Sequence, residues 1–364
     1  MSRVVVAMSG GVDSSVAALL CERAGHEVIG VTMNVWPETD AEIAAQYGGC
    51  CSLAAVDDAR QACARLGIPH YVLNFRRKFE ESVIADFCAA YASGRTPNPC
   101  VVCNRVVKFE HLLRKALELE ADFLVTGHYA RLSRDGSGRY ELRKARYLPK
   151  DQSYALYPLT QYQLAHTLLP IGEYTKAEVR RLAAEAGFAA STKPESQEIC
   201  FVLSGSYRDF LRARQPIGFE EGPIVDSAGN TIGRHDGIAN FTIGQRRGLG
   251  LSSSEALYVV DIRPEERAVV VGPLDELARE GLQASECNWV SIEPPEAAIR
   301  AEVKIRYSAD PVPCVVTPAG EGAASVMFDR PQRAVTPGQA AVFYDGDMLL
   351  GGGTITRSRA PAGT

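Results

Sequence analysis

Residues 9–15 read Ser9-Gly10-Gly11-Val12-Asp13-Ser14-Ser15, and this stretch decides the fold. A short apolar strand is expected before it, over Val4–Met8, and a helix is expected after it, over Ser14–Ala24. Glycines let backbone N–H groups approach an anion closely, and a helix N-terminus supplies orphan donors and a partial positive charge. The stretch is therefore predicted to bind phosphate groups.

Polar side chains within the same loop add to this prediction. Ser9, Ser14 and Ser15 carry hydroxyl donors, and Asp13 is expected either to cap the helix or to hold Mg²⁺. The loop matches neither the G-x-x-x-x-G-K-[ST] pattern nor the G-x-G-x-x-G pattern, which excludes a Walker A loop and leaves a dinucleotide fingerprint unsupported. The simpler alternative is a tight turn with a serine cap, but the full motif between strand and helix favours phosphate binding.

Strand-like and helix-like segments alternate over residues 1–205, which predicts a Rossmann-like parallel α/β domain. The expected strands are Val4–Met8, Glu27–Val31, Tyr71–Phe75 and Phe123–Thr126. The expected helices are Ser14–Ala24, Ala54–Leu66, Phe79–Ala92, Lys108–Leu119 and Lys176–Ala186.

After residue 205, glycine and proline become frequent and the apolar runs shorten to strand length. This pattern predicts two small, mostly β modules, residues 206–282 and 283–364, the last a β-barrel. The expected strands are Ala256–Ile262, Ala268–Val271, Ala301–Tyr307, Pro313–Val316, Ser325–Phe328 and Ala340–Tyr344.

Composition narrows the class of protein. The 364 residues are 46% hydrophobic and 23% charged, which is typical of a globular chain of two or three domains. We expect a cytoplasmic protein without a membrane partner, because no apolar run is long enough to span a bilayer and no signal peptide is evident. In a reducing compartment the ten cysteines are not expected to form a structural disulfide framework. The net charge of −5 does not exclude RNA, which binds to local basic patches.

A second motif presents cysteines and reads Thr96-Pro97-Asn98-Pro99-Cys100-Val101-Val102-Cys103-Asn104. Its two prolines are expected to keep the segment extended, so that Cys103 is presented from a rigid loop. Arg105 and Lys108 follow, and nearby cations stabilise a thiolate. Another cysteine, Cys200, follows the polar residues 196–198; from the residues alone, a simply buried thiol explains it equally well.

The loop at residues 9–15 resembles that of the ATP-pyrophosphatase (PP-loop) enzymes of the adenine nucleotide alpha hydrolase fold, which adenylate a substrate oxygen and release pyrophosphate. Further patches, in family order, resemble the tRNA-specific 2-thiouridylase family. These patches are Gly94–Pro99, Cys103-Asn104, Gly127–Ala130, Lys150–Tyr154, Cys200-Phe201 and Phe241–Gly248.

The resemblance implies ATP-dependent 2-thiolation of the wobble uridine, position 34, in tRNAs of the Lys, Glu and Gln type. ATP adenylates the C2 oxygen, Cys200 carries a persulfide, and Cys103 acts as the nucleophile that resolves it, leaving a transient Cys103–Cys200 disulfide. A sulfur-relay protein or a cysteine desulfurase supplies the sulfur. Asp13 belongs to the catalytic residues in this interpretation.

The resemblance also implies two sets of binding residues. The ATP site, with Mg²⁺, comprises Ala7, Met8, Ser9, Gly10, Gly11, Val12, Asp13, Ser14, Met33 and Gly127. The tRNA and its target base are contacted by Asn98, Pro99, Cys100, His128, Lys150, Asp151, Gln152, Arg306, Tyr307 and Gln339. Arg143, Lys144 and Arg146 form a basic patch just before the Lys150 segment.

One departure from the family opens a second route. Many relatives have Asp where this chain has Cys100, so Cys100, Cys103 and Cys200 supply three possible ligands for a [4Fe–4S] cluster with one open iron. Two other classes of function remain as alternatives. A PP-loop ligase for a small carboxylate leaves the cysteines unexplained, and a non-enzymatic RNA-binding or metal-binding protein leaves the phosphate loop unexplained.

Overall fold

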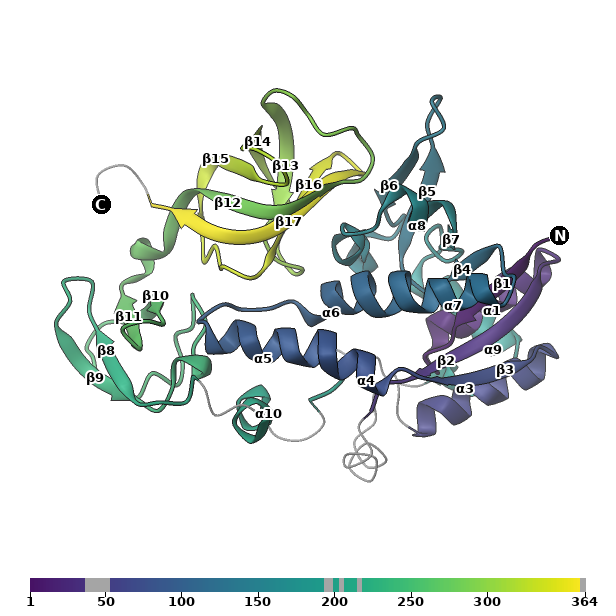
Figure 1. Ribbon diagram of the computed structural model, residues 1–364, viewed down its shortest axis with the longest axis horizontal. Helices are drawn as coiled ribbons and strands as arrows, with labels where there is room; N and C mark the ends of the chain where they lie inside the picture. The colour runs from purple at the N-terminus through teal and green to yellow at the C-terminus, as the bar shows by residue number, and fades with distance from the viewer. Residues whose placement is uncertain (37–52, 193–198, 203–205, 215–217, 361–364) are drawn as a thin grey trace. The chain divides into compact units, whose positions relative to one another are not determined.

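The computed structural model describes residues 1–36, 53–192, 199–202, 206–214 and 218–360 (Figure 1). The chain divides into two compact units. Unit 1 comprises Met1–Val83, Cys100–Gly205 and Asp347–Leu349, and unit 2 comprises Ile84–Pro99, Ser206–Gly346 and Leu350–Thr364. The expected domain boundaries at 205 and 282 stay predictions.

Unit 1 is built on a parallel five-stranded sheet with the order β3-β2-β1-β4-β7. The strands are β1 (Arg3–Ala7), β2 (Glu27–Asn34), β3 (His70–Asn74), β4 (Phe123–Val125) and β7 (Thr167–Leu168). Strands β2 and β3 lie on one side of β1, whereas β4 and β7 lie on its other side. In open α/β sheets ligands bind outside the carboxyl ends of the strands at this reversal, so the sheet confirms the predicted Rossmann-like class and marks the segments after β1 and β4.

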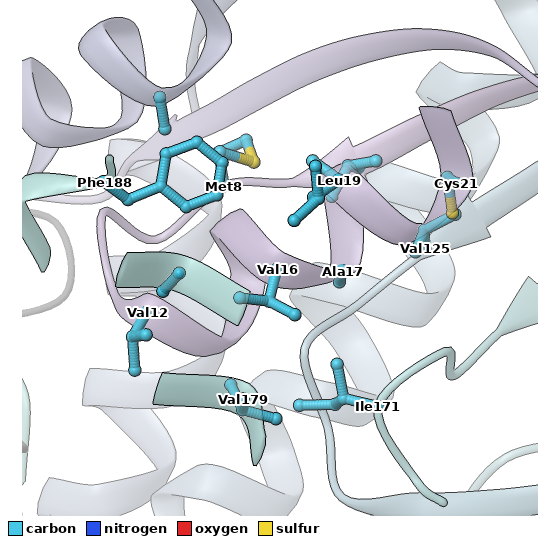
Figure 2. Close-up of a cluster of buried hydrophobic side chains, with 14 of the residues drawn as sticks. Met8, Val12, Val16, Ala17, Leu19, Cys21, Val125, Ile171, Val179 and Phe188 are labelled. Atoms are coloured by element: carbon cyan, nitrogen blue, oxygen red, sulfur yellow. The ribbon is translucent and has the colours of Figure 1, made fainter. Parts of the chain in front are cut away.

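Helix α1 (Val12–Arg23) is mostly buried, as expected for a helix that is apolar on most sides. Figure 2 shows its Val16, Ala17 and Leu19 within the cluster that holds Met8 and Phe188. Each fully buried aliphatic side chain of this kind contributes about 1.5–3 kcal/mol, so the phosphate loop rests on a rigid base. The other helices of unit 1 include α3 (Leu53–Leu66), α8 (Gln161–Ala165) and α9 (Lys176–Glu185). Within the described ranges, no helix is both long and apolar enough to cross a membrane.

Two helices begin earlier than predicted. One runs through α4 (Arg76–Phe79), a π-helical stretch (Glu80–Ile84) and α5 (Ala85–Ala92). The other runs through α6 (Pro99–Val102), a π-helical stretch (Cys103–Leu112) and α7 (Leu113–Glu118). The prediction of a rigid extended loop at Cys103 was therefore wrong. A proline suits the first helical residue because its missing N–H would have no partner there.

Two antiparallel strands of unit 1 were not predicted from the sequence. They are β5 (Ala130–Arg134) and β6 (Tyr140–Lys144), which form a hairpin. The remaining short elements of unit 1 are 3₁₀ turns at Leu148–Lys150, Ser153–Leu156 and Ala189–Thr192. These turns follow the hairpin and carry part of the family-like segment at Lys150–Tyr154.

Unit 2 contains two β-rich parts, as predicted. A four-stranded sheet has the order β10-β11-β8-β9. The barrel has the order β12-β15-β14-β13-β16-β17, and pairing of β12 with β17 closes it. The strands are β8 (Gly222–Val225), β9 (Thr231–His235), β10 (Tyr258–Arg263), β11 (Ala268–Gly272), β12 (Ala278–Trp289), β13 (Ile299–Lys304), β14 (Val312–Pro318), β15 (Ala324–Arg333), β16 (Ala340–Asp345) and β17 (Met348–Arg359). Unit 2 also contains helices α5 and α10 (Tyr207–Arg214) and 3₁₀ turns at Ile238–Asn240 and Leu274–Leu277.

Candidate functional site

The phosphate loop lies between β1 and α1, as predicted. Gly11 is the N-cap residue of α1, and no side chain caps the helix there. The Ser14 and Ser15 hydroxyls each donate to Gly11 O at 3.1 Å, and Ser14 Oγ accepts from Ser9 N at 3.2 Å. The serine hydroxyls thus tie the loop to itself, and the backbone N–H groups of the first helical turn are the donors that remain for an anion.

Two glycines allow other backbone segments to approach this loop. Gly10 has φ +73°, and a Cβ there would lie 2.2 Å from Ala55 O. Gly127 follows β4, and a Cβ there would lie 2.7 Å from Ser14 N. Neither space admits a side chain, so the segment after β4 lies directly against the first turn of α1.

Asp13 is held by two partners in unit 1. Its Oδ1 and Oδ2 accept from Lys176 Nζ at 2.8 and 2.9 Å, and Oδ1 also accepts from Tyr129 Oη at 2.8 Å. The alternative in which Asp13 caps α1 was wrong, because Gly11 is the N-cap and Asp13 already lies within the helix. The carboxylate instead neutralises an ammonium group that is almost completely buried.

Lys176 is the site residue that sequence reasoning missed. It is the first residue of α9, and only 9% of it is exposed. Thr175 and Glu178 form a capping box that fixes where α9 begins. The Thr-x-x-Glu pattern was visible in the sequence and marks Lys176 as a first-turn residue, but its pairing with Asp13 depends on a contact across 163 positions.

These groups fit a nucleotide triphosphate with Mg²⁺. The first-turn N–H groups of α1 and the Lys176 ammonium suit phosphate oxygens, and glycine at positions 10 and 127 permits close approach. Mg²⁺ is commonly held by one or two carboxylates together with substrate phosphates, and Asp13 supplies such a carboxylate.

The two methionines of the predicted ATP site have different surroundings. Met33 lies within β2, near its carboxyl end and partly exposed, whereas it was expected to follow the strand. The Met8 side chain is only 2% exposed and belongs to the apolar core. Its backbone carbonyl accepts from Thr32 Oγ1 at 2.9 Å. The Met33 side chain is therefore accessible to an adenine base, whereas the Met8 side chain packs in the apolar core.

The cysteines of interest are partly accessible. Cys100 is exposed, and Cys103 and Cys200 are each partly exposed, so the alternative of a fully buried Cys200 thiol does not hold. Cys200 lies in a turn closed by Val202 N donating to Ile199 O at 3.0 Å. Residues 196–198, which precede it, lie outside the described part. Among the described residues, no three of His, Cys, Asp and Glu form a group that could hold a metal ion.

The helix that carries Cys103 is anchored one residue further on. Asn104 is 2% exposed and donates from Nδ2 to Ala155 O at 2.9 Å. Its Oδ1 accepts from Lys108 Nζ at 2.9 Å. Both polar ends of a buried amide are thus satisfied, which fixes the rotation of the helix at Cys103. Lys108 was expected to stabilise the Cys103 thiolate. Its ammonium group instead donates a hydrogen bond to the Asn104 side chain.

His128, predicted to contact the target base, is buried. The ring packs 6.1 Å from the Phe109 ring, centroid to centroid, and Nδ1 lies 2.8 Å from Thr126 Oγ1. Burial, together with the nearby Lys108 charge, holds its pKa well below the usual histidine value. His128 is therefore a neutral ring at neutral pH.

Two residues of the predicted tRNA segment at 150–152 use their side chains within the protein. Asp151 accepts from Ala145 N at 2.9 Å and from Ser153 Oγ at 2.8 Å. Gln152 Oε1 accepts from Tyr129 N at 3.0 Å, which fixes the segment after β4. Lys150 is partly exposed. The segment is thus hydrogen-bonded to the end of the Gly127–Tyr129 loop.

The predicted basic patch is partly neutralised. Arg143 Nη2 lies 2.7 Å from Glu141 Oε2, and its Nη1 lies 2.7 Å from Asp347 Oδ1. Arg131 pairs with the same aspartate at 2.6 Å. Arg143 therefore holds two carboxylates, and its charge is not left over for RNA phosphates.

Three predicted tRNA residues, Arg306, Tyr307 and Gln339, lie in loops of the barrel in unit 2. Arg306 and Tyr307 follow β13, and Tyr307 is 48% exposed. Lys304, which was not predicted, places its Nζ 5.5 Å from the centre of the Tyr307 ring. An exposed aromatic ring beside cations is typical of surfaces that stack on unpaired bases. Gln339 follows the Pro337-Gly338 turn, and its side chain bonds to backbone carbonyls of residues 96 and 97.

Three family models match the chain. A tRNA methyl transferase HUP domain matches residues 2–204, a tRNA methyl transferase PRC-barrel domain matches 208–273, and an aminomethyltransferase beta-barrel domain matches 279–355. Their order agrees with the parallel sheet followed by two β-rich parts.

Curated relatives match over nearly the whole chain. The tRNA-specific 2-thiouridylase MnmA of Symbiobacterium thermophilum is 52% identical over 98% of this chain and 92% of its own length. That of Desulforamulus reducens is 51% identical over 98% of this chain and 97% of its own. Among solved structures, a 4-thiouridine synthetase–RNA complex with bound ATP covers 59% of this chain and 50% of that chain, with 17% identity and a TM-score of 0.38.

Proposed function

Because the chain belongs to the tRNA-specific 2-thiouridylase family, we propose that it uses ATP to replace the C2 oxygen of a tRNA uridine with sulfur. The uridine is the wobble residue, position 34, of tRNAs of the Lys, Glu and Gln type. The products are 2-thiouridine, AMP and pyrophosphate. The observation that carries the proposal is the Asp13–Lys176 pair beside a glycine-bounded helix N-terminus.

The first step is adenylation. The uridine C2 oxygen attacks the α-phosphorus of ATP, and the bond from that phosphorus to the bridging oxygen breaks to release pyrophosphate. Negative charge grows on the leaving pyrophosphate, and preorganised donors at that position lower the barrier. The Lys176 ammonium and the first-turn N–H groups of α1 supply such donors, and Asp13 would hold Mg²⁺, which would supply further positive charge to the phosphates.

The second step moves sulfur. Cys200 enters as a persulfide loaded by a sulfur-relay protein or a cysteine desulfurase. The Cys103 thiolate attacks Cys200 Sγ, so the S–S bond to the terminal sulfur breaks and hydrosulfide is released. That sulfur attacks C2, the C2–O bond breaks, and AMP leaves with the former uridine oxygen. A Cys103–Cys200 disulfide remains, and a thiol reductant returns two electrons before the next turnover.

The partial exposure of Cys103 and Cys200 supports this route, since a persulfide must be delivered from another protein. The [4Fe–4S] alternative uses Cys100, Cys103 and Cys200 as ligands. The described residues form no such ligand group, so this structure adds no support to the cluster alternative.

The function is tested by incubating anaerobic, reduced enzyme with unmodified tRNA, ATP and a persulfide donor, followed by nucleoside mass spectrometry. We expect 2-thiouridine only when all components are present, and none with Cys103→Ser or Cys200→Ser. ATP–pyrophosphate exchange without tRNA and without thiolation would instead indicate a ligase for a small carboxylate.

The same assay with Cys100→Ser separates the two sulfur routes. The persulfide route predicts that Cys100→Ser keeps its activity, because Cys100 neither carries nor resolves the sulfur. Loss of thiolation together with loss of iron and of cluster absorbance in an anaerobically reconstituted sample would favour the cluster route.

A further inference from the structure

Within unit 2, a turn of the barrel holds the loop that follows α5. Gln339 Nε2 donates to Thr96 O at 3.0 Å and to Pro97 O at 3.0 Å. In the opposite direction, Thr96 N donates to Pro337 O at 2.9 Å. Three hydrogen bonds therefore join two segments separated by about 240 positions, and two of them come from one side chain.

The turn is itself rigid. Gly338 N donates to Ile355 O and Ile355 N donates to Gln339 O, both at 2.8 Å, so Gly338 and Gln339 are both bonded to strand β17. Gly338 has φ +91°, and a Cβ there would lie 2.8 Å from Thr96 O and 3.0 Å from Thr96 N. The two backbones are thus too close for any side chain at position 338.

The chemistry of the amide determines what Gln339 can do. Both partners are carbonyl oxygens, so the atom that faces them is the amide nitrogen, which has two hydrogens. Each hydrogen is committed to one carbonyl. The amide donors of Gln339 are therefore already used and are not left to read the edge of a base.

We propose that Gln339 is a positioning residue for the thiolation reaction, which fixes the backbone at Thr96 and Pro97 and thereby places the Asn98-Pro99 segment for the target base. This inference rests on the proposed function. Asn98 follows directly in the chain, and Pro99 begins the helix that carries Cys103. A small displacement of reacting groups costs large factors in rate, so the effect falls on turnover and not on binding.

The test compares variants of Gln339 in the full-length enzyme. Gln339→Glu keeps the shape but turns a carboxylate oxygen toward two carbonyls, and Gln339→Met has no donor. Both are expected to lower kcat for 2-thiouridine formation at least tenfold, with KM for tRNA and ATP changed less than twofold. Gln339→Lys, whose ammonium also donates to carbonyls, is expected to keep more of kcat than Gln339→Met.

Hydrogen exchange measured by mass spectrometry supplies a readout that is independent of turnover. We expect faster exchange in the peptide covering residues 93–99 for Gln339→Glu, for Gln339→Met and for Gly338→Ala. Gln332→Glu is the matched control, because the partly exposed Gln332 side chain donates to Arg330 O, two residues away in the same barrel strand. It is expected to change neither exchange nor kcat.

Two outcomes would overturn the proposal. One is unchanged exchange at residues 93–99 in the Gln339 variants. The other is a raised KM for tRNA with normal kcat, which would identify Gln339 as a direct RNA contact. Failure of the proposed function is distinguishable, since wild-type enzyme would then make no 2-thiouridine while the exchange experiment would still report on the Gln339 contact.

Discussion

At the scale of residues, the Asp13–Lys176 ion pair is the main charged feature of the proposed phosphate site. Lys176 is almost completely buried, and a buried ammonium is stable only when a partner balances its charge. Asp13 is that partner, held in place by Tyr129. In the proposed function, Lys176 would gain a phosphate partner and Asp13 would gain Mg²⁺, so the pair is the arrangement from which the proposed phosphate site would be assembled.

Lys176→Met is expected to lower the rate of adenylation by a factor of about 10²–10³, the usual effect of removing one preorganised donor from a developing charge. The measurement is tRNA-dependent formation of AMP and pyrophosphate. Lys115→Met is the matched control, because Lys115 pairs with Glu118 on the surface of α7. Equal activity of Lys176→Met and wild type would remove Lys176 from the phosphate site.

His128 gives a prediction about pH. Its folded-state pKa is lowered by burial, so the unfolded chain binds more protons once the pH falls below about 6.5. The contribution of His128 to stability is therefore complete above that pH and is lost as the pH decreases. We expect the free energy of unfolding of His128→Gln, measured by urea titration, to fall less steeply between pH 7 and 5 than that of wild type. His70 and His235 titrate in both proteins, so parallel slopes would contradict this assignment.

The sequence predicted the residues of the phosphate loop because their conformation is local. Gly10 and Gly11 stand between a strand and a helix, and the structure places the loop at the position where it was expected. The partners of Asp13 could not be predicted, because Tyr129 and Lys176 come from distant positions that only the sheet order brings together. Reasoning from one residue at a time therefore left a helix cap among the alternatives for a carboxylate that forms an ion pair.

At the scale of elements, the first residues of two helices determine the positions of the Lys176 ammonium and the Cys103 thiol. The capping box of Thr175 and Glu178 sets the first residue of α9 and thereby the position of the Lys176 ammonium. Pro99 in the same way begins the helix that carries Cys103. The sequence predicted that Pro97 and Pro99 would bar a helix, and this failed from Pro99 onward, because a proline at a helix start is as favourable as one in a loop. Most strands were predicted within a few residues, because alternation and turn residues are local signals.

Thr175→Ala is expected to raise KM for ATP severalfold and to lower stability by about 1 kcal/mol, the usual cost of losing an N-cap. Thr160→Ala is the matched control, because Thr160 and Gln163 form an equivalent capping box at α8, which carries none of the residues bonded to Asp13 described above. We expect the two variants to lose similar stability in thermal unfolding, with only Thr175→Ala changing KM. An equal KM in both would show that the start of α9 does not set the phosphate site.

At the scale of the whole molecule, residues with proposed roles come from the parallel sheet, from α6 and from the barrel. The segment Ile84–Pro99 groups with the β-rich unit although it precedes much of the parallel sheet in sequence. Periodicity reveals elements but not which elements pair, so the sequence predicted the order of the parts and missed this grouping. The family resemblance identified Gln339, and the structure supplied its carbonyl partners.

The central claim is that ATP activates the uridine oxygen itself. The most direct test follows that oxygen, using tRNA whose wobble uridine carries ¹⁸O at C2 and analysing the nucleotides by mass spectrometry after a single turnover. The account predicts one ¹⁸O atom in the phosphate of AMP for each 2-thiouridine formed, with none in pyrophosphate. Release of the label into water, or its retention in the tRNA while 2-thiouridine fails to form, would contradict it.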